Sequence, residues 1–170
     1  SWRLEERYPM QNTEELSWEL GSSELSLIEG GNTILPDRNS GPIYQTPPLE
    51  EDLYFGGLPR LHINVNTATV GGQIYALLED CDGNNCIHIG HAIMDLRYHA
   101  GGTEEQAWVP VLEDITAYME FFAMDVEVEA GHTIRLSLMS TGEDYLPSAA
   151  SSVVNVINAG STLQLDTFDP

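Results

Sequence analysis

The residues best placed for chemistry lie in one short acidic turn, DCDGNNC, at positions 80–86. Asp80, Asp82 and Asn84 are spaced like the first oxygen ligands of a calcium loop, and Ca²⁺ prefers such hard donors. Gly83 lies too early for the glycine of an EF-hand, and no Glu follows at the twelfth position. Asp-Gly and Asn are also the ordinary residues of a hairpin turn. Two interpretations therefore stand, a plain hairpin and a Ca²⁺ site, and no other cofactor is expected.

The two cysteines of the chain, Cys81 and Cys86, flank the same turn. Residues paired so close to a tight turn can reach the short Cα separation that a disulfide requires. We predict a disulfide between them, with two free thiols as the alternative. A disulfide implies an oxidising compartment, so an extracellular or cell-surface location is expected rather than the cytoplasm.

Catalytic patterns are missing from the sequence. A hydrolase nucleophile elbow needs Gly-x-Ser-x-Gly, and the serines that follow Gly21 and Gly160 lack the second glycine. Adjacent acidic residues are frequent, but a catalytic pair needs carboxyl groups in opposed environments, which the sequence does not show. We assign no catalytic and no cofactor-binding residue, so the chain alone is not expected to be an enzyme.

The histidines and tryptophans give weaker signals. His88 and His91 lie three apart on an expected strand, so strand alternation predicts that they face opposite sides and share no metal. Structural or solvated histidines are expected, and the alternative is that two or three of the five converge in space: His62, His88, His91, His99 and His132. Three tryptophans would form a sugar-binding platform if they met on one face, although such residues more often pack in a core: Trp2, Trp18 and Trp108.

The elements that position these residues are strands. Leu61, Ile63 and Val65 alternate with polar residues, which is typical of a half-buried antiparallel strand. Gly71-Gly72 is interpreted as a hairpin turn, and one short helix is expected near Asp114–Met119. We predict an all-β, two-sheet antiparallel β-sandwich. Its expected strands are Arg60–Thr67, Gln73–Asp80, Ile87–Tyr98, Ala107–Leu112, Phe121–Glu129, Thr133–Met139, Ser151–Ile157 and Ser161–Leu165.

The length of 170 residues predicts a single domain over residues 1–170. Residues 1–43 are expected to form an irregular lead-in with short edge strands near Ser17–Glu19 and Glu24–Leu27. Since the chain begins with Ser1, we expect a processed form or a domain of a longer protein. No apolar run approaches the roughly 18 residues of a membrane span.

The charge is strongly unbalanced, with 27 acidic against 6 basic residues and a formal net charge of -21. All six basic residues are arginines. Such a surface repels phosphates and anionic lipid, so nucleic acid is not an expected partner. It also repels itself unless salt screens it, which predicts a high-salt environment; an ordinary acidic secreted protein is the alternative.

Several motifs, taken in order, resemble the C-terminal domain of the X-prolyl dipeptidyl peptidase and cocaine esterase (CocE/NonD) hydrolase family. The opening motif consists of Tyr44, Pro48-Leu49-Glu50-Glu51-Asp52-Leu53, Gly57 and Pro59-Arg60-Leu61. Further similar segments are Trp2-Arg3, Tyr75–Gly83, Asp95-Leu96-Arg97-Tyr98, Ala130–Leu136 and Ser161–Leu165. The resemblance spans nearly the whole chain, and it departs from the family at the cysteine-flanked turn and in the lysine-free surface.

The resemblance implies a jelly-roll β-sandwich like galactose-binding modules, packed on an α/β-hydrolase domain that carries the catalytic residues. The expected function is that of a non-catalytic module of a secreted or halophilic serine hydrolase acting on X-Pro peptide or acyl ester bonds. The alternative is a stand-alone extracellular β-sandwich for binding or self-assembly, whose partners are other copies of itself. Carbohydrate binding rests on analogy of fold alone.

Overall fold

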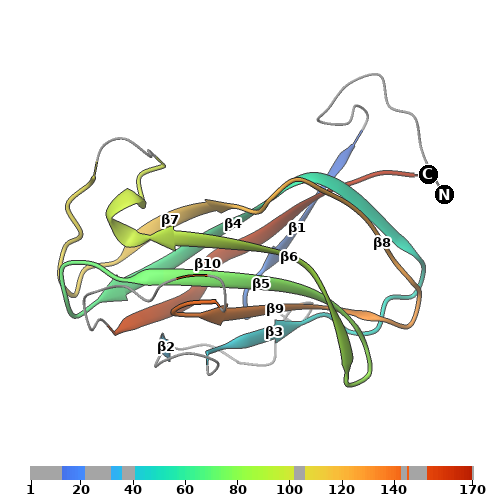
Figure 1. The fold of residues 1–170 in the computed structure, drawn as a ribbon, viewed down its shortest axis with the longest axis horizontal. Coiled ribbons are helices and arrows are strands. Elements are labelled where there is room, and N and C mark those ends of the chain that lie inside the picture. Colours follow the sequence, from blue (N-terminus) through green and yellow to red (C-terminus); the bar gives the residue numbers. More distant parts are fainter. Residues whose placement is uncertain are drawn as a thin grey trace.

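In the computed structural model, the described residues are 13–21, 32–35, 41–101, 106–142, 145 and 153–169. They form ten strands and one 3₁₀ helix (Figure 1). The strands are β1 Glu14–Glu19, β2 Asn32–Leu35, β3 Ile43–Gln45, β4 Leu53–Thr67, β5 Gln73–Asp82, β6 Asn85–Asp95, β7 Ile115–Glu120, β8 Met124–Val128, β9 Thr133–Met139 and β10 Val154–Thr167, and the 3₁₀ helix η1 is Leu96–Tyr98. All strand pairs are antiparallel.

One sheet is built on two long strands, β4 and β10, which pair with each other through the middle of the molecule (Figure 1). Each outer edge of this pair is shared by two shorter strands. On the β4 side, β8 covers the first half of β4 and β7 the second half. On the β10 side, β2 pairs with the beginning of β10 and β1 with its end. The sheet therefore contains six strands.

The second sheet has four strands in the order β3-β9-β5-β6. Its central strand β5 is apolar on both faces, as expected for a strand flanked by β9 and β6. Together the two sheets confirm the predicted antiparallel β-sandwich.

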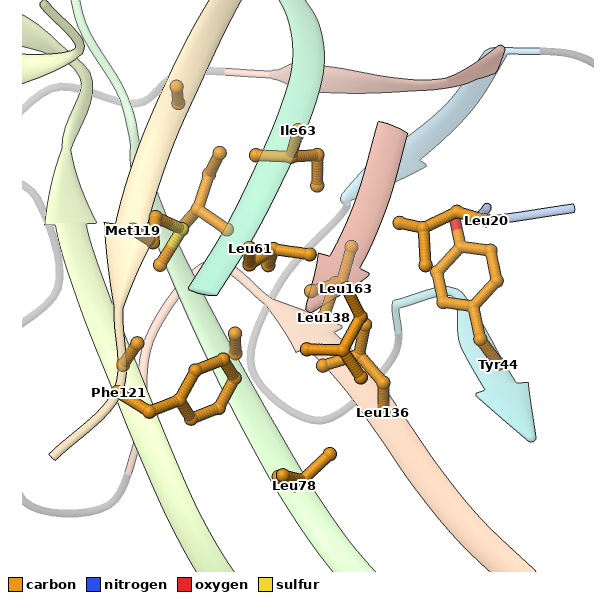
Figure 2. Packing of buried hydrophobic residues seen from close by; sticks show 14 of the residues in the cluster. Leu20, Tyr44, Leu61, Ile63, Leu78, Met119, Phe121, Leu136, Leu138 and Leu163 are labelled. Carbon is orange, nitrogen blue, oxygen red and sulfur yellow. The ribbon is translucent and has the colours of Figure 1, made fainter. Parts of the chain in front are cut away.

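The core lies between the two sheets (Figure 2). Strand β4 contributes Leu61, Ile63 and Val65, which are fully buried while their neighbours are partly exposed, so the predicted alternation is confirmed. Side chains from the other sheet meet them, and the largest fully buried ones include Tyr44, Leu78 and Leu136. At about 25 cal/mol per Å² of apolar area, this burial is the main stabilising contribution to folding.

Three predicted elements were wrong. The expected helix at Asp114–Met119 is strand β7, whose Ala117 and Met119 point inward while Tyr118 and Glu120 are exposed. The expected strand Ala107–Leu112 forms only an isolated bridge at Val111. Gly71-Gly72 does not close a hairpin, because β4 and β5 belong to different sheets.

Other differences concern strand ends. The two expected closing strands are one continuous strand, β10, with a register shift between Ile157 and Thr162. An edge strand does occur near Ser17–Glu19, as β1. Strand β2 was not expected, and the predicted strand Glu24–Leu27 lies outside the described residues.

Candidate functional site

The turn at 80–86 is the tip of the β5–β6 hairpin, which projects from one end of the sandwich (Figure 1). Cys81 and Cys86 are direct partners in the strand register and form a disulfide, so the predicted disulfide is present. Gly83 takes the first position of the two-residue loop with φ of 58°, a value that glycine adopts without strain. The bridge and the turn together fix the hairpin end.

The three predicted Ca²⁺ ligands lie on this hairpin, but one of them has another partner. The carboxylate of Asp80 contacts His132 Nδ1 at 2.8 Å, whereas Asp82 and Asn84 are exposed. This contact raises the pKa of His132, mainly through the hydrogen bond to Asp80. Within the described ranges, no group of three or more His, Cys, Asp or Glu residues is arranged to hold a metal. The Ca²⁺ site stays a prediction.

The prediction that His88 and His91 face opposite sides was wrong. Their nitrogens approach each other, with His91 Nδ1 at 3.3 Å from His88 Nε2. The cause is a β-bulge: Leu78 pairs with Gly90, but the next residue, Glu79, pairs with His88. Ile89 is therefore an inserted residue, which shifts the alternation of β6 by one position.

His91 is held in place by its surroundings. Its Nε2 lies 2.9 Å from the hydroxyl of Tyr145, and its ring stacks on Tyr75 with centroids 5.5 Å apart. Phe122 and Tyr145 contact the same ring edge-on. Tyr75 in turn packs so closely under Gly142 that a Cβ there would lie 2.4 Å from the ring. The imidazole therefore sits in an aromatic cage on an edge strand.

A second feature is a group of exposed aliphatic side chains at the other end of the sandwich, which we call the end patch: Val70, Val111, Leu112 and Val153. Their segments are joined around the end of β4. Thr67 pairs with Val111 and accepts a hydrogen bond from Leu112 N at 2.8 Å, while Ala68 N donates to Val153 O. Trp108, which is 75% exposed, lies on the same segment as Val111. Sequence reasoning missed this patch, because nothing in the sequence shows which loops meet.

Leu112 is strained as well as exposed. Its φ of 61° is the only positive value at a non-glycine residue in the described part of the chain. A leucine in this left-handed region costs roughly 1–2 kcal/mol. Yet its side chain is 69% exposed and gains little from burial in the isolated chain. An exposed leucine held at such a cost points to a contact surface.

The other predicted features do not assemble into a site. Trp18 is buried in the core, so it is not available to a sugar-binding platform with Trp108, and Trp2 lies outside the described residues. No helix in the described residues is long and apolar enough to cross a membrane.

Comparison with known proteins places the chain in a family. The model of the X-Pro dipeptidyl-peptidase C-terminal non-catalytic domain matches residues 1–168. A search of curated proteins gives no match.

Solved structures share the fold at low sequence identity. An aminopeptidase from a marine sediment archaeon (Thaumarchaeota) and a CocE/NonD family hydrolase from Staphylococcus aureus each match with a TM-score of 0.79 and 10% identity. In both cases the match covers 99% of this chain and 39% of the other. An alpha-amino acid ester hydrolase matches with a TM-score of 0.65 and 12% identity, over 95% of this chain and 33% of that one. The chain thus spans about two fifths or less of the length of these structures.

The family model covers almost the whole chain, the motifs that resemble the family lie along its full length, and the fold is shared with two hydrolases and an aminopeptidase. The chain therefore belongs to the family of X-Pro dipeptidyl-peptidase C-terminal non-catalytic domains.

Proposed function

We propose that this chain is the non-catalytic β-sandwich module of a serine hydrolase of the X-Pro dipeptidyl-peptidase or CocE/NonD type. The observation that carries the proposal is the family match over residues 1–168. The module would stabilise an α/β-hydrolase domain and form part of the wall of its entrance. The acyl or X-Pro peptide chemistry would belong to that other domain.

The natural polypeptide tests this proposal directly. An antibody raised against the 170-residue chain is used to isolate the protein from its source, and a fluorophosphonate probe labels active serine hydrolases in the same sample. We expect one species well above 18.8 kDa that takes up the probe, while the isolated chain takes up none. An unlabelled natural species of 18.8 kDa, above all one that forms ordered polymers, would contradict the proposal and favour self-assembly.

The end patch is the surface that we propose meets the catalytic domain. It presents aliphatic side chains on a protein of net charge -21, and Leu112 is kept there despite its backbone strain. Burying such side chains at about 25 cal/mol per Å² against a second domain would offset that cost.

Leu112→Asp tests the surface in the full protein, with Ile87→Asp as the matched control. Ile87 is 63% exposed, close to the value for Leu112, but it lies on β6 near the hairpin tip. We expect Leu112→Asp to weaken the docking of the two domains at least about tenfold, because a buried unpaired charge is costly. Both substitutions should leave the isolated module folded. Equal effects of the two substitutions on docking would contradict the assignment.

The setting of the protein is a further proposal, supported by the Cys81–Cys86 disulfide and by the charge. We infer an extracellular or cell-surface protein that works at high salt. Screening of the acidic surface predicts that the free energy of unfolding rises between about 0.1 M and 1 M KCl, as the Debye length falls from about 10 to 3 Å. A stability independent of KCl, measured by urea unfolding, would argue against adaptation to salt.

Calcium binding is proposed separately, at Asp80, Asp82 and Asn84. Because Asp80 also contacts His132, Ca²⁺ bound there would compete for the carboxylate and lower the raised pKa of His132. An NMR titration of His132 with and without Ca²⁺ measures this, with Asp82→Ala as the variant that should abolish the change. An unchanged titration curve at saturating Ca²⁺ would eliminate the site.

A further inference from the structure

We propose that His88 and His91 form a binding site for a divalent transition-metal ion, with Zn²⁺ as the ion that fits best. The proposal goes beyond the role of a hydrolase module and rests on the arrangement of the two rings. Two Zn–N bonds of about 2.0–2.1 Å at a tetrahedral angle place the ligand nitrogens about 3.3 Å apart. The observed separation of His91 Nδ1 and His88 Nε2 is 3.3 Å.

The hydrogen bond on the far side of His91 supports metal binding. Its Nε2 lies 2.9 Å from the Tyr145 hydroxyl, and in the tautomer that carries the proton on Nε2 the ring donates to that oxygen. The Nδ1 atom then keeps its lone pair on the side of His88. Histidine ligands of metals typically make such a hydrogen bond through their second ring nitrogen, which fixes both the tautomer and the orientation of the ring.

Tyr145 is itself anchored through its backbone. Tyr145 N donates to Gly142 O at 3.1 Å, and Thr141 Oγ1 donates to Tyr145 O at 3.1 Å. Tyr145 and the other aromatic rings around His91 hold its imidazole in one orientation. Metal binding therefore requires ordering of His88 alone, which is exposed on the edge strand.

The donor set selects the class of ion. Imidazole suits Zn²⁺, Cu²⁺ and Ni²⁺, whereas Ca²⁺ and Mg²⁺ prefer oxygen ligands. In the described part of the chain, no third His, Cys, Asp or Glu joins the pair as a metal-binding group. A net charge of -21 raises the local concentration of any cation. The pair borders a shallow hollow of about 200 Å³ that is also lined by Phe122 and Met124.

The test is a calorimetric titration of the oxidised 170-residue chain with Zn²⁺, in the presence of about 10 mM Mg²⁺ to occupy surface carboxylates. We expect one equivalent of Zn²⁺ to bind, and both His88→Ala and His91→Ala to weaken binding at least about tenfold. His62→Ala is the control, because His62 lies on β4 against Tyr118, and it should bind like the parent chain. Undiminished binding in both variants, or no Zn²⁺ binding by the parent chain, would overturn the proposal.

A second measurement on the unmodified chain makes the test independent of variant folding. Trace Ni²⁺ or Cu²⁺ should broaden the imidazole NMR signals of His88 and His91 before those of the other three histidines. Tyr145→Phe keeps both donor nitrogens but removes the orienting hydroxyl, so we expect a several-fold weaker affinity with the same two signals affected. Broadening that begins at other histidines would refute the site.

Discussion

Tyr44 offers a sharp test of how the core is held together. Its side chain is fully buried between the sheets, and its hydroxyl donates a hydrogen bond to Asn158 Oδ1 at 2.6 Å. Burial raises the pKa of Tyr44 well above its ordinary value of 10.0. Above pH 10 the unfolded chain therefore releases a proton that the folded chain keeps. The free energy of unfolding must then fall with pH, by up to about 1.4 kcal/mol per unit.

Few groups other than tyrosines titrate in this pH range, because of the composition of the chain. The chain has no lysine, both cysteines are in a disulfide, and an α-amino group titrates near pH 8. Between pH 9.5 and 11.5, which are about the limits set by the α-amino group and arginine, tyrosines are the groups that change charge. Tyr44→Phe should cost about 1 kcal/mol at pH 7, because it removes one buried hydrogen bond. The variant should also lack the steep fall of the unfolding free energy at alkaline pH. The curves of unfolding free energy against pH for the parent chain and for Tyr44→Phe should cross near pH 11, where the parent chain has lost about 1 kcal/mol.

Urea unfolding followed by far-UV circular dichroism, in constant high salt, measures both curves. Tyr54→Phe is the control, because Tyr54 donates to Glu127 at an exposed position and its removal should leave most of the slope in place. A loss of stability with pH in Tyr44→Phe as steep as in the parent chain would show that Tyr44 is not the source of the slope.

Three other outcomes follow from the same structure. Because the pKa of His132 is raised, its contact with Asp80 stabilises the fold fully below a pH of about 6.5, and this stabilisation is lost as the pH rises through the folded-state pKa. The difference in stability between the parent chain and Asp80→Asn should therefore shrink from pH 5.5 to about 8. A difference that stays constant over this range would contradict the prediction. Reduction of the Cys81–Cys86 disulfide should cost about 2 kcal/mol for so short a loop, and urea midpoints that do not differ between oxidised and reduced chains would show that the bridge is not stabilising. Leu61→Ala should cost about 3 kcal/mol in the same urea assay, since the residue is fully buried at the centre of β4, and a loss below about 1 kcal/mol would place it outside the core.

Much of the fold follows from alternation along the strands. The pattern of Leu61, Ile63 and Val65 predicted a core-facing strand, and β9 was predicted with its observed bounds, Thr133–Met139. The segment Ile115–Glu120 also alternates, although a short helix was expected there. Pairing with β4 over six residues overrides that weak local preference.

Other features depend on contacts between distant segments. The end patch unites residues from three segments around Thr67, and no local pattern links Val70 to Val153. The connection at Gly71-Gly72 looks like a hairpin turn by composition. Whether two neighbouring strands pair or change sheet is decided by the register of the whole sandwich, which a short stretch of sequence does not encode.

The wrong prediction for His88 and His91 shows that a glycine inside a strand can mark a β-bulge. Side chains alternate between the two faces only along a strand without bulges. In this protein the bulge at Ile89 lies next to Gly90, and the register shift in β10 contains Gly160. At Gly90 a Cβ would lie 2.4 Å from Met124 Cε, so glycine there leaves room for the end of the Met124 side chain. An isolated glycine inside a strand pattern signals such a bulge. Had Gly90 been interpreted in this way, the sequence His-Ile-Gly-His would have placed His88 and His91 on one face, and the pair would have been a metal-site candidate from the outset.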